Sequence, residues 1–291
     1  MSERYDVIII GHVTDDLLDD RGRVTRFIGG GAYFSSFAAK RSGAELLVVT
    51  KLAEKDFGLL EGMKKEGIEV IALRSTHTTS IENFFETEDV DRRVVNLVAQ
   101  AEPLSLEDVP EADTAIFNLT GLFRGDIPSE MIEPLAAKAE VALDLQCMLR
   151  WSEGGSFAWR DWPEKRECLP HITYLKADSL ESKVITGTED RREAARILCG
   201  WGAREVLITH SSEVILYDGK TMHCAHFNPS NLSGRTGRGD TCFGSYLAWR
   251  LDHGVEESLR YAAALTSIKM EKPGPFQGTV EEVLRRMKDK D

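Results

Sequence analysis

Short runs of aliphatic residues recur along the chain and alternate with longer, amphipathic stretches. The run at 7–10 is Val-Ile-Ile-Ile, which is typical of a strand buried on both faces of a parallel sheet. Further strand-like runs lie at 46–50, 68–73, 115–119, 141–145, 172–175 and 205–209. Most of them are separated by stretches with helical periodicity, so the pattern predicts an α/β fold with a mainly parallel sheet.

The helical stretches have recognisable ends. We expect one helix to end at Arg41, and two others to begin at Asp178 and Asp240. Further helices are expected at 56–66, 128–139, 190–199, 255–269 and 279–288. Residues 151–170 are rich in Trp and Gly without such a pattern, so we expect them to be irregular.

The pattern changes between residues 78 and 100. The stretches 79–86 and 93–99 are strand-like, and the residues at 88–91 between them indicate a hairpin turn. We expect this hairpin and the region 14–27 to form a small β lid. Because a small sheet has open edges, pairing with the lid of a second subunit would cover them, which predicts a homodimer.

Residues 234–249 combine a glycine-rich turn with the start of a helix. Gly237 and Gly239 allow close approach of a ligand to the backbone, and the N–H groups of a helix N-terminus bind anions such as phosphate. A carboxylate at such a place, here Asp240, could take a proton from a hydroxyl that attacks phosphorus. Asp240 could equally be an N-cap, since Asp is a favoured capping residue.

The segment 236–241, Thr-Gly-Arg-Gly-Asp-Thr, resembles the C-terminal signature of the ribokinase/PfkB family of carbohydrate kinases. The resemblance implies a ribokinase-like three-layer sandwich with a mainly parallel central sheet and a small β lid. It also implies that Gly237, Arg238 and Gly239 form an anion hole for the transferred phosphate. Asp240 would then be the catalytic base and contact the acceptor hydroxyl.

Three departures from the family affect what the resemblance implies. Arg238 stands where a small residue is usual, and it could contact a phosphate or point to solvent. Gly234 stands where the family often has Asp, which puts a monovalent-cation site in doubt. At 209–214 the family often has Thr-x-Gly-x-x-Gly, but Ser211 and Val214 replace the glycines, so the phosphoryl donor stays open.

A second group of residues is expected to bind the acceptor. Asp15 and Asp16 follow the first strand and could bind the hydroxyls of a polyol or be solvated turn residues. The resemblance assigns Asp16 to the sugar hydroxyls and lays the backbone of Gly29 and Gly30 against the sugar. Phe34 occupies the position of the third glycine of a dinucleotide-binding fingerprint, which excludes that class of site.

The remaining candidates concern the nucleotide and its metal. Asp178 and Glu181 have the spacing of a capping box, and their oxygens also suit Mg²⁺, directly or through water. Asp144 and Arg150 match a family motif near the active site, or they form a structural ion pair. The nucleotide-binding residues that the resemblance implies are Lys176, Asp178, Thr209, Ser211, Gly239 and Gly274.

Composition narrows the functional classes. The 291 residues carry a net charge of -12, which argues against a nucleic-acid partner. The five cysteines are widely spaced, without a C-x-x-C pair, which predicts reduced thiols in the cytoplasm and no zinc site. No apolar run approaches the ~18 residues of a membrane span, so we expect no membrane partner. The length suits a single domain covering 1–291.

Together these observations predict an ATP-dependent phosphotransferase with Mg²⁺, acting on a hydroxyl of a small sugar or polyol, inositol-like compounds included. Two alternatives stay open. A nucleoside kinase would need an aromatic wall for the base, which Phe34 or Phe85 could supply. A metabolite sensor on a kinase fold would bind its ligand without turnover, since fold does not fix function.

Overall fold

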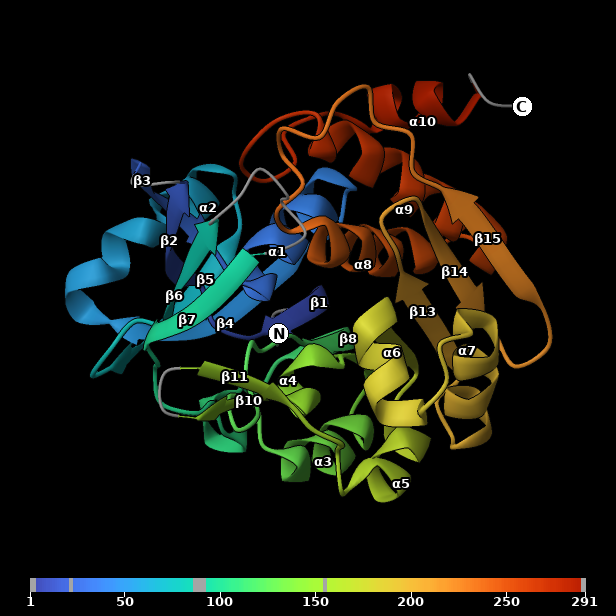
Figure 1. Cartoon of the computed structure of the whole chain (residues 1–291), viewed down its shortest axis with the longest axis horizontal. Coiled ribbons are helices and arrows are strands. Elements are labelled where there is room, and N and C mark those ends of the chain that lie inside the picture. Colours follow the sequence, from blue (N-terminus) through green and yellow to red (C-terminus); the bar gives the residue numbers. More distant parts are fainter. Residues whose placement is uncertain (1–3, 21–22, 86–92, 154–155, 289–291) are drawn as a thin grey trace.

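A nine-stranded sheet runs through the molecule (Figure 1). The computed structural model describes residues 4–20, 23–85, 93–153 and 156–288. All neighbouring strands of the sheet are parallel except the pairs β13–β14 and β14–β15 at one edge. In sheet order the strands are β15 (Met222–His226), β14 (Glu213–Tyr217), β13 (Glu205–Thr209), β12 (Tyr174–Asp178), β9 (Glu140–Asp144), β8 (Asp113–Leu119), β1 (Arg4–Ile10), β4 (Leu46–Ala53) and β5 (Glu69–Ser75).

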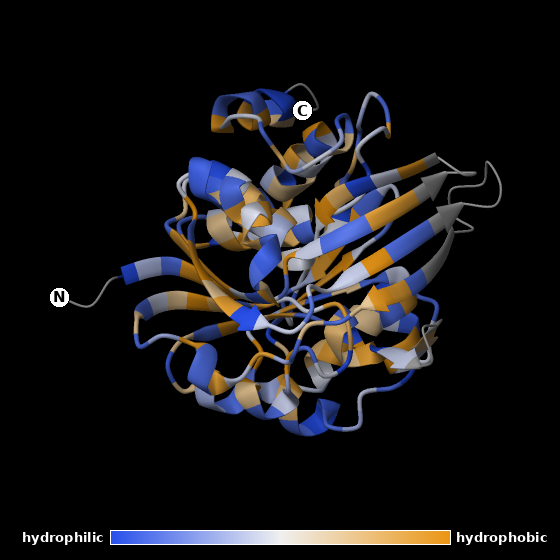
Figure 2. Ribbon diagram, turned by 90° about the vertical axis from the view of Figure 1, so that its left-hand side faces the viewer, coloured by the Kyte–Doolittle hydropathy of each residue, from blue (hydrophilic) through white to orange (hydrophobic). Residues whose placement is uncertain are grey.

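Strand β1 shows why the sheet is covered on both faces. Successive side chains of a strand point to opposite faces, and in β1 both faces are aliphatic. Val7 and Ile9 belong to one buried cluster, and Ile8 and Ile10 to the other. In Figure 2 the hydrophobic residues accordingly gather along the strands, and hydrophilic residues lie on the outer helices. The mainly parallel, three-layer architecture predicted from the sequence is confirmed.

Helices cover both faces of this sheet. The first cluster contains side chains of α1 (Gly31–Arg41), α2 (Glu61–Lys65), α8 (Arg238–Arg250) and α9 (Val255–Met270). The second contains side chains of α3 (Ile132–Ala136), α4 (Gln146–Leu149), α6 (Ser179–Thr186) and α7 (Arg191–Gly200), with α5 (Lys165–Cys168) beside it. The last helix, α10 (Val280–Lys288), packs on α9 through Val283. No helix in the described ranges has the length and apolar character that a membrane crossing requires.

A separate four-stranded sheet forms the lid, as predicted. Its order is β3 (Arg23–Gly29), β2 (Thr14–Asp20), β6 (Ser80–Phe85) and β7 (Arg93–Ala99). The outer pairs are antiparallel, whereas β2 and β6 are parallel. The hairpin turn expected at 88–91 lies outside the described residues.

Three local expectations were wrong. The stretches expected as helices at 56–66 and 128–139 are partly 3₁₀. Gly58 weakens α-helix formation in the first, whereas Pro134 of the second lies in the first turn of an α-helix, where proline is tolerated. The region 151–170 is more regular than expected, since it contains a hairpin and the short helix α5. The additional elements are η1 (Glu54–Leu60), η2 (Leu106–Asp108), η3 (Ser129–Met131), η4 (Leu169–His171), β10 (Arg150–Glu153) and β11 (Ser156–Trp159).

Helices α1 and α8 pack closely side by side, and this pair brings the predicted site together. A Cβ atom on Gly244 of α8 would lie only 2.4 Å from the backbone oxygen of Ser35 in α1. The N-termini of the two helices therefore meet, so that the glycine run before α1 faces the glycine-rich turn before α8. These two segments are about 200 residues apart in the chain.

Candidate active site

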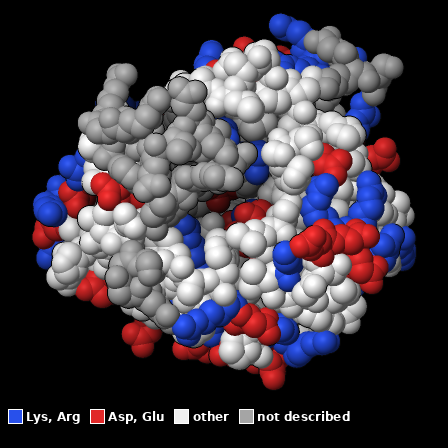
Figure 3. Space-filling model, in the orientation of Figure 1, with Lys and Arg blue, Asp and Glu red and all other residues white. Residues whose placement is uncertain are grey.

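The glycine run 29–31 lies between two carboxylates. A Cβ atom on Gly29 would lie 2.3 Å from Oδ2 of Asp16, and one on Gly31 would lie 3.2 Å from Oδ1 of Asp240. A side chain at either position would fill the space beside a carboxylate. The structure thus brings Asp16 of the lid and Asp240 of α8 to the two ends of one short stretch of bare backbone. Figure 3 shows a hollow near the middle of the molecule, with acidic and basic side chains inside it.

Asp16 is buried in strand β2, where it has a defined partner. Its Oδ1 accepts a hydrogen bond from the backbone N–H of Ile81 at 3.1 Å. Burial raises the pKa of its carboxyl to about 6. Its neighbour Asp15 is also buried and forms an ion pair with Arg26. The alternative that both are solvated turn residues is therefore wrong.

Asp240 lies in the first turn of α8 and is half-buried. Burial raises the pKa of its carboxyl to about 6, although the ammonium group of Lys176 opposes this shift. The N-cap of α8 is Gly237, with a φ of 76°, a left-handed conformation that glycine adopts without strain. Asp240 is consequently not the N-cap, and the structural alternative for this residue is wrong.

Two side chains from other helices contact the turn before α8 and fix its position. A Cβ atom on Gly237 would overlap the ring of Phe34, so this glycine is pressed against the aromatic face. The Nζ atom of Lys269 lies 4.9 Å from the centre of the same ring and donates hydrogen bonds to the carbonyl oxygens of Gly234 and Thr236. The backbone of the predicted anion hole is therefore positioned by a buried aromatic ring and a buried ammonium group.

Close packing explains why a glycine occupies position 234. A Cβ atom there would lie 1.7 Å from the carbonyl oxygen of Lys272. The loop after α9 therefore approaches the turn too closely for the Asp that the family often has at this position. Lys269, at the end of α9, supplies the positive charge beside the turn.

Lys176 lies at the centre of a buried acidic cluster. Its Nζ donates to Oδ1 and Oδ2 of Asp144 at 3.0 and 2.9 Å, and it lies 3.7 Å from Oε2 of Glu181. The carboxylates of Asp144, Glu181, Asp240 and Asp178 together raise the pKa of Lys176 well above its usual range, against the effect of burial. Because four carboxylates surround one lysine, the cluster has the oxygen donors and the excess negative charge that a hard divalent cation requires.

Asp178 and Glu181 form the capping box expected from their spacing. Oδ1 of Asp178 accepts from the N–H groups of Leu180 and Glu181, and Oε2 of Glu181 accepts from the N–H of Asp178 at 2.7 Å. Burial raises the pKa of Glu181 well above its usual range, and Asp178 adds to the effect. The structural interpretation of this pair is confirmed, and a role towards Mg²⁺ stays a prediction.

Two other predicted donor-binding residues, Thr209 and Ser211, lie at the turn between β13 and β14. Thr209 pairs with Asp178 across the sheet, and a Cβ atom on Gly239 would lie 3.3 Å from Nζ of Lys176 and 3.8 Å from Oγ1 of Thr209. Ser211 is exposed in this turn. Gly274 is exposed in the loop after α9 and has a φ of 87°.

Basic side chains also converge on this turn. Burial lowers the pKa of His210, and the positive charges of Arg191 and Arg238 lower it further, so all three groups are electrostatic neighbours. Arg238 is the first residue of α8, so its positive charge adjoins the N-terminus of that helix, whereas Arg191 forms an ion pair with Glu213. An anion with several charges would be attracted to this place.

Comparison with known proteins gives the family. The model of the pfkB family of carbohydrate kinases matches residues 5–281. The chain belongs to the pfkB family of carbohydrate kinases. It is therefore a carbohydrate or polyol kinase, as the resemblance of residues 236–241 to the family signature implied.

Three relatives illustrate the range of the family. A sulfate complex of a pyrophosphate-dependent kinase in the ribokinase family is 33% identical, with a TM-score of 0.90 and coverage of 96% of this chain and 99% of that one. Such a kinase complexed with a pyrophosphate analog and myo-inositol is 32% identical, with a TM-score of 0.89 and the same coverage. Cytidine kinase from Thermococcus kodakarensis is 28% identical over 288 residues, covering 94% of this chain and 99% of that protein.

Thr120 and Lys269 of this pfkB site were not predicted from the sequence, and the surroundings of Arg150 were not predicted either. Thr120 follows β8, and its Oγ1 would clash with a Cβ atom on Gly31. Lys269 lies inside a helix, where a lysine predicts only an exposed position. Arg150 is buried, with its guanidinium 4.3 Å from the ring centre of Phe157, and its charge lowers the pKa of Asp16 against the effect of burial. Only the position of Thr120 at the carboxyl end of a parallel strand could have indicated a ligand site.

Proposed function

We propose that this kinase transfers a phosphoryl group to a hydroxyl of a small polyol or sugar, with Asp240 as the general base. The observation that carries the proposal is the position of Asp16 and Asp240 at the two ends of the glycine run 29–31. Bare backbone between two carboxylates suits a small, flat molecule rich in hydroxyl groups. Asp16 and the backbone of Gly29 and Gly30 would bind hydroxyls away from the reaction, and Asp240 would bind the reacting one.

The proposed reaction has a simple proton balance. Asp240 accepts the proton of the attacking hydroxyl while the oxygen forms a bond to phosphorus, and the bond from phosphorus to the bridging oxygen of the donor breaks. The N–H groups of Gly237, Gly239 and Asp240 would stabilise the charge on the transferred group, whereas that of Arg238 already donates to the carbonyl oxygen of Arg235. A carboxyl whose pKa is about 6 is ionised at neutral pH and still basic enough for this transfer.

A metal ion completes the proposal. Asp178 and Glu181 would hold Mg²⁺ directly or through water, and the surplus of carboxylates around Lys176 supports this assignment. When bound, Mg²⁺ would neutralise charge on the phosphates of the donor. Lys176 would contact the donor beside Gly239, which is its neighbour.

Two donors are candidates. ATP is the donor expected from the sequence, with Thr209, Ser211 and Gly274 around the nucleotide. Pyrophosphate is the second, and the pyrophosphate-dependent relatives at 32–33% identity support it. The positive groups near His210 support it too, because a donor without a base to bury must be held largely by charge.

For the acceptor, a cyclic polyol of the inositol type is favoured over a nucleoside. The relative complexed with myo-inositol supports the polyol, and cytidine kinase supports the nucleoside. Phe34, one of the two candidates for an aromatic wall, is covered by Gly237 and Lys269 and is only 3% exposed. The side chain of the other, Phe85, lies outside the described residues.

The test is a matrix of two donors and a panel of acceptors. The purified chain is incubated with Mg²⁺ and either ATP or pyrophosphate, together with inositols, sugars or nucleosides, and phosphorylated product is measured. Product from an inositol or a sugar supports the proposal, and the donor that gives it identifies the donor site. Product only from cytidine would favour a nucleoside kinase. Tight binding of a polyol without product from either donor would favour the sensor and contradict the proposal.

We also propose that the chain acts in the cytoplasm as a dimer formed through the lid. Val24 in β3 and Val98 in β7 are 57% and 56% exposed, and these strands are the two edges of the lid sheet. Contact with the lid of a second subunit would bury these apolar side chains and pair the open edges, which would stabilise both lids. Sedimentation of the native chain and of Val98→Lys tests this: the native chain should be a dimer and the variant a monomer, and a native monomer would contradict it.

A further inference from the structure

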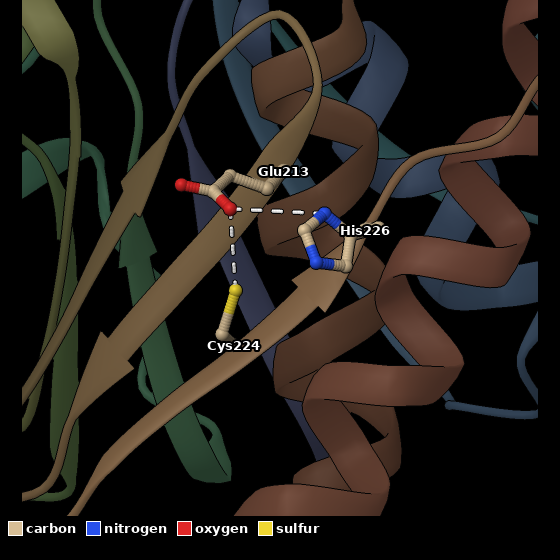
Figure 4. Close-up of side chains that lie close together, drawn as sticks. All are labelled: Glu213, Cys224 and His226. Carbon is tan, nitrogen blue, oxygen red and sulfur yellow. Dashed lines mark hydrogen bonds and ion pairs between the residues drawn. The ribbon is translucent and has the colours of Figure 1, made fainter.

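A group of potential metal ligands lies at the opposite edge of the large sheet from β5. Among the residues that the structure describes, Glu213, Cys224 and His226 form one group whose ligand atoms all lie within 4.8 Å of one another. Figure 4 shows the three side chains converging from the adjacent strands β14 and β15. Oε2 of Glu213 lies 3.3 Å from Sγ of Cys224 and 3.7 Å from Nδ1 of His226.

The strand register explains this convergence. Glu213 is the direct antiparallel partner of His226, and Cys224 precedes His226 by two residues on β15. Residues two apart on a strand share a face, so all three side chains point to the same side of the sheet. Ala225, between them, points to the other side and is buried in the core. Because β15 is an edge strand, its exposed face leaves room for an ion and water.

We infer that Glu213, Cys224 and His226 form a site for Zn²⁺ or a similar borderline divalent ion, with water as the fourth ligand. In tetrahedral zinc sites the bonds are about 2.0–2.3 Å long, which separates ligand atoms by about 3.3–3.6 Å. The two distances from Oε2 of Glu213 are already close to that range. Thiolate, imidazole and carboxylate together are ligands typical of zinc.

Arg191 lowers the expected affinity of the site for a cation, but it does not occupy the Glu213 oxygen that faces the other two ligands. Its NH2 atom donates to Oε1 of Glu213 at 2.7 Å, whereas Oε2 is the oxygen that faces the other two ligands. The arginine therefore fixes the carboxylate in place, as outer partners of metal ligands commonly do. Its positive charge also opposes a cation, so we expect weaker binding than at a site with four protein ligands.

No zinc site was expected from the sequence, because the cysteines and histidines lack the spacing of metal ligands along the chain. The three ligands here come together through cross-strand pairing. A thiol binds a metal as the thiolate, so a bound metal must displace the proton of Cys224. Binding should therefore release about one proton and weaken as the pH falls.

The test uses the full chain, freed of metal by a chelator and reduced with a phosphine that does not bind zinc. Co²⁺ replaces Zn²⁺ as the probe, because a thiolate bound to Co²⁺ gives a charge-transfer band. We expect the band to appear with one ion per chain and to vanish when Zn²⁺ is added. Cys224→Ser should abolish it, and His226→Ala or Glu213→Gln should weaken the affinity for Co²⁺ at least about tenfold.

Two control variants separate this site from non-specific binding. His223→Ala changes a residue on the same strand whose side chain points to the other face, and Cys168→Ser removes a different partly exposed thiol. Both should bind Co²⁺ like the native chain. The inference is overturned if the native chain gives no band, if the band survives in Cys224→Ser, or if either control variant loses it. None of these readouts depends on kinase turnover.

Discussion

Lys269 donates a hydrogen bond from its Nζ to the backbone carbonyl oxygen of Gly234. The bond joins the end of α9 to the turn that precedes α8, and a second bond from the same atom reaches the carbonyl of Thr236. A buried ammonium group thus holds two carbonyl groups of the turn that leads into the predicted anion hole. The two bonds fix the backbone that precedes Gly237, and thereby the position of the proposed anion hole that follows it.

Lys269→Met should therefore lower kcat by about tenfold or more while leaving the fold intact, because it loosens the turn without removing a group that contacts substrate. Burial lowers the pKa of Lys269 to about 8, so the activity of the native chain should decline above about pH 8 as the ammonium loses its proton. The variant should lack this alkaline decline. Lys272→Met, an exposed change in the loop that follows α9, is the control. A native-like pH profile of kcat for Lys269→Met would contradict the positioning role.

Asp240→Asn should reduce kcat by about 10²–10⁴-fold and at the same time stabilise the chain. The amide cannot accept the hydroxyl proton. Burial raises the pKa of the carboxyl from 3.8 to about 6, so ionisation at neutral pH costs stability in the folded state, and the neutral amide avoids it. The gain should be about 1–3 kcal/mol, measured by denaturant unfolding at pH 7. Asp252→Asn, at an exposed position, should change neither quantity, and retained turnover in Asp240→Asn would exclude the base assignment.

The pH dependence of kcat/KM should show an acidic decline centred near pH 6. Burial raises the pKa of both Asp16 and Asp240 to about 6, and both must be ionised, one to bind hydroxyls and the other to accept a proton. Below this pH both become protonated, so activity is lost as the pH falls and is full above it. Initial rates between about pH 5 and 8 would measure this. Full activity at pH 5 would show that neither carboxylate has the proposed role.

Gly29→Ala should raise the KM for the acceptor by about tenfold or more and leave the KM for the donor unchanged. The added methyl group would lie 2.3 Å from Oδ2 of Asp16, so it would displace that carboxylate from its position. Gly58→Ala is the matched control, because a Cβ atom there meets nothing within 4 Å. Equal effects of Gly29→Ala on both substrates would mean that the glycine run does not face the acceptor.

Gly244→Ala should destabilise the chain by about 1–3 kcal/mol, because the methyl group would lie 2.4 Å from the backbone oxygen of Ser35 and push α1 away from α8. Gly200→Ala, in helix α7, meets nothing within 4 Å and should stabilise by up to about 1 kcal/mol through helix propensity. Thermal unfolding compares the two. If Gly244→Ala unfolds at the same temperature as the native chain, the α1–α8 contact has room for a methyl group and the prediction is wrong.

The order of strands and helices could be predicted because its causes are local. In β1 the aliphatic residues on both faces required two covering layers, and both are present. The boundaries at 128–139 were less predictable, since the hydrophobic pattern is continuous although η3 precedes α3 and residues 137–139 lie beyond it. The irregular appearance of 151–170 concealed a hairpin, because β10 and β11 are only four residues each.

Only some of the residue contacts in the site could be predicted from the sequence. Asp178 and Glu181 are three residues apart, so their capping box followed from spacing alone. The partner of Asp144 was different: the structure joins it to Lys176, 32 residues away, whereas the sequence suggested Arg150. Parallel pairing of β9 with β12 brings Asp144 and Lys176 side by side, and such pairing cannot be read from a motif.

By itself, the sequence determined the fold class, the glycine-rich turn and its acidic residue, because backbone freedom at glycine and burial of aliphatic side chains act over a few neighbouring positions. Tertiary structure alone decided that Asp16 and Asp240 face one glycine run, and that Lys269 supports the turn from a different helix. These relationships depend on how distant segments pack, and the free energy of packing belongs to the whole core rather than to any stretch of residues.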